Sequence, residues 1–260
     1  MTSPYEFCTV EKQNHIWEIT INRPESMNAL HPPANFELET IFNDFSVDSS
    51  AWIAILVGAG DKAFSTGHDL KYQAAGNKIE IPKTGFAGLT NRFDLDKPVI
   101  AAVNGYAMGG GFEIALACDL IVADQSAKFA LPEVKVGLAA VAGGIHRLPR
   151  QINEKLAMEL LLTGRSVDAE EARSLGLVNQ ITASGQALSG ARELAGTLLN
   201  CSPVSLQVTK QMFREGQAMP DLETAVSHRY DAFTRMASSK DFIEGPKAFA
   251  EKRKPEWSGE

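Results

Sequence analysis

Three consecutive glycines begin at Gly109, and two glutamates follow them, Glu113 and, twenty residues further on, Glu133. Glycines ahead of a helix leave backbone N–H groups accessible, and the positive end of the helix dipole lies there, so this segment favours a negatively charged ligand atom. Glu133 follows an apolar stretch at 129–131, where an unpaired carboxylate is unfavourable. Anion-stabilising N–H groups beside two poorly solvated carboxylates indicate acid–base chemistry on a substrate that develops oxyanion charge.

Each glutamate also has a purely structural interpretation. Glu113 could be a charge at a helix N-terminus, and Glu133 could be one half of a buried ion pair. For a single glutamate the structural role is the usual one. The pair beside a glycine-rich turn favours a catalytic role for both.

A second candidate segment contains Ser65, Gly67, His68 and Asp69. The serine, histidine and aspartate are the residue types of a hydrolytic triad, but the chain has no G-x-S-x-G motif here, and residues so close in sequence do not easily align as a relay. We interpret them as turn residues. A turn at Gly67 would point the backbone N–H of His68 into a pocket, where the N–H of Gly110 would complete a two-donor oxyanion hole.

Residues 58–63 match the dinucleotide fingerprint G-x-G-x-x-A in form. Ser65, Thr66 and Gly67 stand where the cofactor-binding helix would begin, and the preceding strand is not the first of a βαβ unit. We therefore do not expect a nicotinamide cofactor.

The elements that must position these groups follow from the hydrophobic periodicity. Residues 17–21 alternate as a strand does, and apolar residues at helical spacing predict a helix over 33–45. The stretches 52–57, 99–103 and 120–123 are continuous apolar strands, and a short helix begins near Glu113. Buried strands alternating with helices predict an α/β fold whose sheet is covered on both faces.

The chain after Arg147 is predicted to be almost wholly helical. Thr163-Gly164 is a helix stop, Asp168 and Glu171 fit a capping box, and Gly176 ends the helix that they begin. The predicted elements are a helix at 169–175, an edge strand at 177–181, and helices at 184–199, 203–217, 221–237 and 242–251. Residues 76–88 form a loop, for which a mobile, pocket-shaping role and a plain surface excursion are equally favoured.

Composition excludes several classes of function. The 260 residues suit one large domain or a domain with a small appendage, and a net charge of -7 argues against binding to nucleic acid or a membrane surface. The three cysteines are scattered, so we expect no disulfide and no metal site, and a reducing cytoplasm fits best. The N-terminus carries no signal-peptide pattern, and the longest apolar run, 51–57, is too short to cross a bilayer.

An ordered series of segments resembles the enoyl-CoA hydratase/isomerase family, also called the crotonase family. The matching segments are 22–30, 62–70, 97–105, 129–137 and 169–178. Within the family, the segments 85–90, 105–107 and 244–253 are most similar to the carnitinyl-CoA dehydratase branch.

The resemblance implies a fold and an assembly. Residues 1–200 would form a core of repeated ββα units with an acyl-CoA site, and residues 201–260 a helical region that builds homotrimers, often as a dimer of trimers. The substrate would be an acyl-CoA thioester and no separate cofactor would be needed, since coenzyme A is part of the substrate.

The resemblance also implies roles for residues. His68 and Gly110 would be the two oxyanion donors, and Glu113 and Glu133 would be the two catalytic glutamates of true hydratases, whereas isomerases of the family usually keep only the second. The implied substrate-binding residues are Met27, Ala29, Leu30, Ala63, Ser65, Gly67, His68, Asp69, Leu70, Gly109, Gly110, Pro132, Glu133, Leu138 and Val141.

Retention of both glutamates predicts an enoyl-CoA hydratase, a lyase. Three alternatives stay open: a carnitinyl-CoA dehydratase, an isomerase that uses Glu133 alone, and a catalytically idle acyl-CoA-binding relative. The chain departs from the family at Ala140-Val141, where a Pro-Gly or Pro-Asp pair is common. Val141 is expected to make the acyl pocket tighter and less polar.

Overall fold

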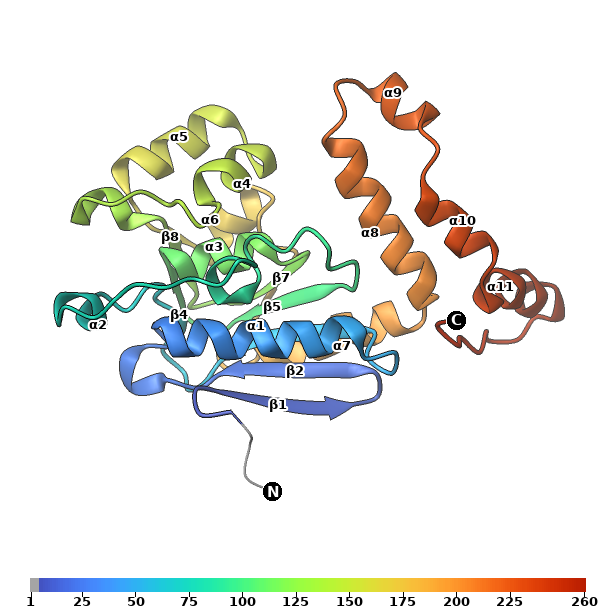
Figure 1. Cartoon of the computed structure of the whole chain (residues 1–260), viewed down its shortest axis with the longest axis horizontal. Helices are drawn as coiled ribbons and strands as arrows, with labels where there is room; N and C mark the ends of the chain where they lie inside the picture. Colours follow the sequence, from blue (N-terminus) through green and yellow to red (C-terminus); the bar gives the residue numbers. More distant parts are fainter. Residues whose placement is uncertain (1–4) are drawn as a thin grey trace.

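The computed structural model describes residues 5–260 and has a sheet-based core with a helical arm on one side (Figure 1). The larger sheet of the described chain has the strand order β1-β2-β3-β5-β7-β10, in which β1 pairs antiparallel with β2 and the other neighbours are parallel. Its strands are β1 (Cys8–Gln13), β2 (Ile16–Ile21), β3 (Ile53–Gly58), β5 (Val99–Val103), β7 (Leu120–Asp124) and β10 (Gln180–Thr182).

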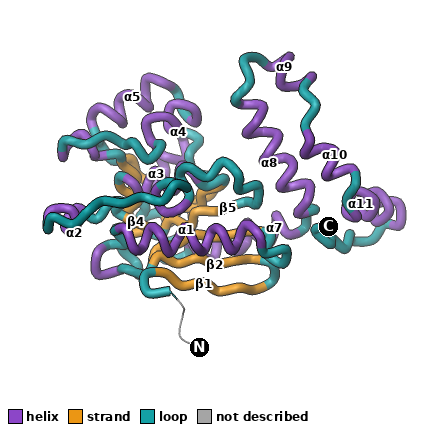
Figure 2. Tube along the Cα trace, viewed as in Figure 1, coloured by secondary structure: helices purple, strands orange, loops and turns teal. Residues whose placement is uncertain are grey.

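The central strands of this sheet are buried on both faces, as the sequence predicts. Alternate residues such as Ile55 and Ile100 face helix α7 (Ala187–Leu199), whereas Leu56 belongs to the core that includes helix α1 (Pro32–Val47). Figure 2 shows α1 and α7 beside the sheet. The period of two explains why these strands are continuous apolar runs in sequence.

A second sheet, with the order β4-β6-β8-β9, was not predicted. Its strands have only two or three residues, too few to show an alternating pattern, and β1 was missed because its exposed half is polar. With these strands the chain shows repeated ββα units, as the family resemblance implies. The second-sheet strands and the helices that follow them are β4 (Ala63–Ser65), α2 (Leu70–Ala74), β6 (Tyr106–Met108), α3 (Gly110–Ala117), β8 (Lys128–Ala130), η3 (Pro132–Val136) and β9 (Val167–Asp168).

Several predicted boundaries need correction. Helix α3 starts at Gly110 rather than near Glu113, because Gly110 and Gly111 are themselves helical, and the edge strand is 180–182 rather than 177–181. The helix predicted over 221–237 is two helices, α9 (Leu222–Ser227) and α10 (Asp231–Ala237). Between them the chain is extended at His228, and the Tyr230 hydroxyl donates to a carbonyl of α9.

The helix signals after Arg147 are largely confirmed. Helix α4 (Gly144–Gln151) and helix α5 (Glu154–Thr163) come first, and α5 ends at a left-handed Gly164 with φ 56°. Asp168 caps helix α6 (Ala169–Ser174) by accepting from the N–H of Glu171 at 2.8 Å. The second half of the capping box is absent, because the Glu171 carboxylate pairs with Arg165 at 2.7 Å instead.

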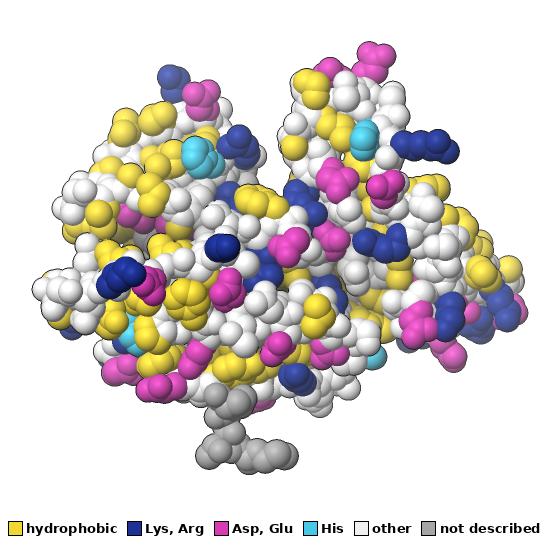
Figure 3. Space-filling view, in the orientation of Figure 1, with side chains coloured by type: hydrophobic (Ala, Val, Ile, Leu, Met, Phe, Trp, Pro, Cys, Tyr) yellow, Lys and Arg dark blue, Asp and Glu magenta, His cyan; other side chains and the backbone are white. Residues whose placement is uncertain are grey.

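The arm consists of α8 (Pro203–Gln217), α9, α10 and α11 (Lys240–Glu251), and it has a small hydrophobic cluster of its own. Hydrophobic side chains are also exposed along the arm and over α5, where Figure 3 shows them in yellow. No helix within residues 5–260 is long and apolar enough to cross a membrane. The predicted loop is irregular until a short 3-10 helix, η2 (Phe86–Gly88), which is buried.

Candidate active site

The site is built around the first turn of α3, which lies in very close contact with two other segments. A Cβ on Gly111 would lie 2.0 Å from the carbonyl oxygen of Ser65, and a Cβ on Gly110 would lie 2.6 Å from the Phe86 ring. Only glycine allows both approaches. The glycine run therefore lets the start of α3 meet the end of β4 and the end of the 76–88 loop.

The two predicted oxyanion donors lie on neighbouring backbone segments. Leu30 forms a parallel bridge with His68, donating to the carbonyl of Gly67 and accepting from Asp69. In this pattern the N–H of His68 points away from Leu30. A Cβ on Gly67 would lie 2.5 Å from the nitrogen of Gly110, so the two segments touch. Within residues 5–260 neither the N–H of His68 nor that of Gly110 has a protein acceptor.

The two glutamates reach this turn from different elements. Glu113, in the first turn of α3, is 3% exposed, and its Oε1 accepts the N–H of Gly144 at 2.8 Å. Glu133 comes from η3, and a Cβ on Gly109 would lie 3.0 Å from its Oε1. The Oε2 of Glu133 is buried without a hydrogen-bond partner in the described chain. Two carboxylates thus lie beside the glycine turn, one of them with an unsatisfied oxygen.

Burial raises the pKa of both carboxyls. The pKa of Glu113 rises to about 7, through burial and then the charge of Glu133, against the opposing effects of the N–H groups of Gly144 and Ala142 and the charge of Arg147. The pKa of Glu133 is raised by burial. Because a poorly solvated carboxyl titrates closer to neutral pH than an exposed one, the pair can accept and donate protons there.

The local geometry removes two possibilities that the sequence left open, the hydrolytic triad and the dinucleotide fingerprint. Ser65 donates to the carbonyl of Asn28 at 2.8 Å, His68 contacts Gln73, and Asp69 pairs with Arg23 at 3.0 Å, so the three residues form no relay. The segment after residue 63 is strand β4 rather than a helix, which excludes the dinucleotide fingerprint. The described residues contain no group of three or more His, Cys, Asp or Glu that could hold a metal ion.

The remaining predicted substrate-binding residues differ in burial and in their place around the turn. The carbonyl of Met27 accepts the N–H of Thr66 at 3.1 Å, which joins the 27–30 segment to the 65–68 segment. Three of the predicted residues, Ala29, Leu30 and Ala63, are buried. Pro132 begins η3, whereas Leu70 and Leu138 are exposed hydrophobic residues.

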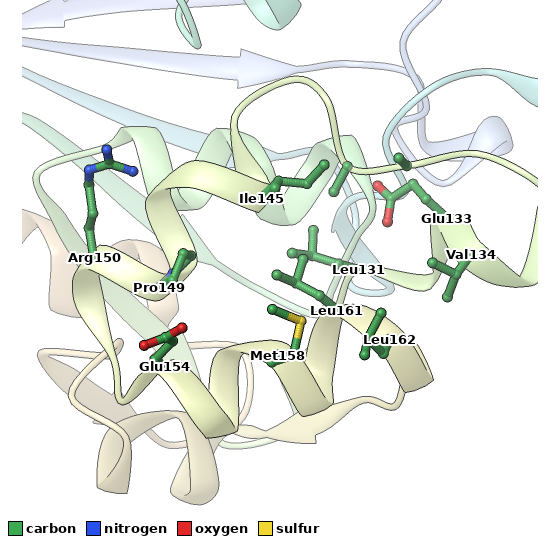
Figure 4. A pocket seen from close by; sticks show the side chains of 12 residues that line it. Leu131, Glu133, Val134, Ile145, Pro149, Arg150, Glu154, Met158, Leu161 and Leu162 are labelled. Carbon is green, nitrogen blue, oxygen red and sulfur yellow. The ribbon is translucent and has the colours of Figure 1, made fainter.

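A cavity of about 520 Å³ opens beside Glu133 (Figure 4). Glu133 lies at one end, and Arg150 and Glu154 lie at the other, with aliphatic side chains between them. The lining residues are Leu131, Glu133, Val134, Ala139, Ala140, Ile145, Pro149, Arg150, Glu154, Met158, Leu161 and Leu162.

Ala140 lines this cavity, whereas Val141 is 80% exposed and stands outside the lining. A role for Val141 in narrowing the pocket stays a prediction. The contributions of α4 and α5 to the cavity were not predicted from the sequence. The spacing of Met158, Leu161 and Leu162 on one face of α5 was the available signal.

The chain is similar to known proteins over nearly its whole length. A family model described as enoyl-CoA hydratase/isomerase matches residues 11–260. The carnitinyl-CoA dehydratase of Citrobacter koseri is 46% identical over 249 residues, covering 94% of this chain and 95% of that protein. The carnitinyl-CoA dehydratase of Escherichia coli K12 is 44% identical over 262 residues, covering 98% and 99%.

Two solved structures are also similar to this chain. The enoyl-CoA hydratase from Mycobacterium tuberculosis H37Rv superposes with a TM-score of 0.92 at 39% identity, and the carnitinyl-CoA hydratase from Mycobacterium avium with 0.77 at 38%. Each comparison covers 98% of this chain and 99% of the other.

Proposed function

Because the chain belongs to the enoyl-CoA hydratase/isomerase family, we propose that it is an enoyl-CoA hydratase, a hydro-lyase that reversibly adds water across the 2,3-double bond of a 2-enoyl-CoA thioester. The observation that carries this proposal is the buried carboxyl of Glu113 and the half-buried carboxyl of Glu133, whose Oε2 is itself buried, beside two backbone N–H groups that have no acceptor within residues 5–260. An isomerase needs one such carboxylate, whereas addition of water uses one base and one acid.

The thioester oxygen would lie between the N–H groups of His68 and Gly110. As water attacks C3, the π electrons of the double bond move toward this oxygen, and the two donors stabilise the enolate charge that results. Removing one such donor in other enzymes lowers the rate by roughly 10²–10³. The close contact between Gly67 and Gly110 supports this arrangement, since it brings the two donor segments together.

The two carboxyls would divide the proton transfers. Glu113 takes a proton from the attacking water as the C3–O bond forms, and Glu133 gives its proton to C2 as the enolate collapses. Glu113 then holds one proton and Glu133 has lost one, so a proton exchange with solvent restores the starting state. In dehydration the same groups act in reverse, with Glu133 as the base.

The part of the acyl chain beyond C3 would extend into the cavity beside Glu133. This cavity is lined by aliphatic side chains, and no aromatic ring of residues 5–260 lines it. Phe86 packs on Gly110, Tyr72 lies against His31, and Phe93 stands beside Arg147. Because a quaternary ammonium group is bound best by aromatic faces, the lining supports an uncharged acyl chain.

A second candidate is carnitinyl-CoA dehydratase, whose substrate carries a trimethylammonium group. The observation that favours it is the 46% and 44% identity to proteins of that name. Glu154, at the far end of the cavity, offers one carboxylate for a cation, but the cation of Arg150 lines the same end.

The helical arm of residues 201–260 supports assembly as a homotrimer or a dimer of trimers. Exposed hydrophobic side chains lie along it, and they suit burial against a second copy of the chain. The residues are Phe213, Leu222, Val226, Phe233, Phe242, Ile243 and Phe249.

Glu113→Gln and Glu133→Gln test the mechanism. Each variant is expected to lower hydration by about 10²–10⁴, because each removes one proton-transfer partner, while affinity for a saturated acyl-CoA stays close to wild type. The measurement follows loss of the enoyl absorbance with crotonyl-CoA and crotonobetainyl-CoA side by side, and Glu170→Gln, an exposed glutamate of α6, is the control.

Near-normal turnover in either active-site variant would contradict the two-glutamate mechanism. Preference for the betaine would favour the carnitinyl-CoA dehydratase. Isomerisation of a 3-enoyl-CoA that survives in Glu113→Gln, with no hydration by the wild type, would favour the isomerase. Binding without any turnover would favour a catalytically idle acyl-CoA-binding protein.

A further inference from the structure

Arg147 of α4 is a partly buried cation without a carboxylate partner in the described part of the chain. Arg23, Arg165 and Arg192 all pair with acids, but within residues 5–260 no Asp or Glu forms an ion pair with Arg147. Burial lowers the pKa of this guanidinium, against the effect of Glu113. Since burying an unpaired charge is unfavourable, the position of Arg147 calls for an explanation.

The guanidinium joins two segments of the active site. Its Nη2 donates to the carbonyl of Thr90 at 2.6 Å, and a Cβ on Gly143 would lie 2.1 Å from its Nη1. The Phe93 ring lies 5.7 Å away, close enough for a cation–π contact. One side chain therefore contacts both the 86–93 segment and the Gly143 turn.

The 86–93 segment leads to the oxyanion side of the site. The hydroxyl oxygen of Thr90 accepts the N–H of Phe86 at 2.8 Å. The Phe86 ring packs against Gly110, where a Cβ would be 2.6 Å from it. Arg147 thus supports, through Thr90 and Phe86, the position of the Gly110 donor.

The Gly143 turn leads to the other side of the site. The N–H of Arg147 donates to the carbonyl of Gly143 at 2.7 Å, and the next residue, Gly144, donates to Glu113. The charged groups that act on Glu113 are Glu133 from η3 and Arg147 from α4, and Cys118 at the end of α3 also lies within the field of Arg147. Arg147 is therefore a positive charge that acts on the predicted base, against the effect of Glu133 when that carboxyl is ionised.

We propose that Arg147 is a positioning residue for the proposed hydration, which ties the Phe86–Thr90 segment to the Gly143–Gly144 turn and brings a positive charge to the turn that holds Glu113. This inference rests on the proposed function. It adds a residue that touches neither the thioester nor the water and acts through its neighbours.

Arg147→Gln and Arg147→Lys test the proposal. Loss of the charge raises the pKa of Glu113. The acidic side of the pH profile of kcat/KM therefore moves to higher pH. At a pH below the pKa, kcat/KM falls about tenfold for each unit by which the pKa rises. The lysine variant keeps the charge, so the acidic side of its pH profile lies close to that of the wild type. It loses the double contact to Thr90 and Gly143, so its kcat stays below the wild-type value. KM changes less than kcat in both variants.

Infrared difference titration of the Glu113 carboxyl, assigned with Glu113→Gln, gives a readout that does not need turnover. Arg173→Gln, an exposed arginine of α6, is the control and should leave the titration and the profile unchanged. Thermal unfolding and binding of butyryl-CoA show whether each variant is folded.

We expect Glu113 to titrate at higher pH in Arg147→Gln than in the wild type. In Arg147→Lys it should titrate close to the wild-type pH. A folded Arg147→Gln protein whose Glu113 titration and pH profile are unchanged overturns the proposal. An equal loss of butyryl-CoA affinity in both variants, with unchanged kcat and pH profile, also overturns it. If the wild-type protein hydrates no enoyl-CoA, the proposed function fails first, and the infrared titration still decides whether Arg147 acts on Glu113.

Discussion

The stability of the protein and the proposed catalytic role of Glu113 make opposite demands on this residue. Its carboxyl is 3% exposed, and its pKa rises to about 7 from an ordinary value of 4.5. The folded protein therefore binds this proton more tightly than the unfolded chain, and stability falls as pH rises from about 4.5 to 7. Above pH 7 the folded state keeps an ionised, poorly solvated carboxylate that the proposed reaction needs as a base.

At this residue we predict that Glu113→Gln is more stable than wild type above pH 7. The neutral amide removes the charge and can still accept the N–H of Gly144. The gain is on the order of 3 kcal/mol at most, and it fades toward pH 4.5, where Glu113 is protonated in the wild type as well. Urea unfolding at a series of pH values measures it.

Glu170→Gln, on an exposed helix face, is the matched control and should show no such pH-dependent gain. A Glu113→Gln protein that is less stable than wild type at pH 8 would show that the carboxylate is stabilised by its neighbours, and our account of its pKa would be wrong.

At the scale of elements, α3 depends on contacts that a side chain would prevent. Gly111 lies in the first turn, where a Cβ would be 2.0 Å from the backbone oxygen of Ser65. Gly196, in the last turn of α7, has nothing within 4 Å of an added Cβ. The same substitution in these two helices therefore separates the effect of close packing from that of helix propensity.

Gly111→Ala is expected to destabilise the protein by about 1–3 kcal/mol or more, because the start of α3 must move away from β4. Hydration should fall with it, since the Gly110 donor and Glu113 lie on the same turn. Gly196→Ala should be neutral or stabilise by about 0.5–1 kcal/mol. Thermal unfolding and crotonyl-CoA hydration measure both, and wild-type behaviour of Gly111→Ala would contradict the packing that we describe.

At the scale of the whole molecule, Asp241 of α11 connects the helices of the arm to the last residues of the chain through hydrogen bonds. This carboxylate is 4% exposed, and it accepts the hydroxyl of Ser202 at 2.7 Å and the N–H of Ser258 at 2.8 Å. Nearby, Trp257 donates to the carbonyl of Asn200 at 2.9 Å and packs against the cluster that includes α7. One buried side chain thus links the start of α8, helix α11 and the last residues.

Asp241→Ala is expected to lower stability by about 1–3 kcal/mol, since it leaves the buried hydroxyl of Ser202 and the partly buried N–H of Ser258 without their acceptor. It should also weaken the proposed trimer, because the arm would no longer be held in one place. Thermal unfolding and mass measurement in solution test both effects, with exposed Glu256→Ala as the control. An unchanged melting temperature in Asp241→Ala would contradict this role for the carboxylate.

Local patterns were enough to predict much of the fold. The strand at 99–103 and the helix at 203–217 were predicted with the boundaries that the structure has, since each shows its period over its full length. The two- and three-residue strands of the second sheet were not, because pairing with neighbours rather than composition makes them strands. The break at His228 also lacked a local signal, as no glycine or proline lies there.

The sequence by itself determined which groups we propose to react, because glycines that allow close backbone contact and carboxylates in apolar segments can be recognised from their neighbours along the chain. Only the tertiary structure decided what surrounds them. Glu113 meets Gly144 across 31 residues, and Arg147 meets Thr90 across 57. Such contacts depend on how helices pack on the sheet, so the support of the predicted base and the cavity beside Glu133 appear only in the folded chain.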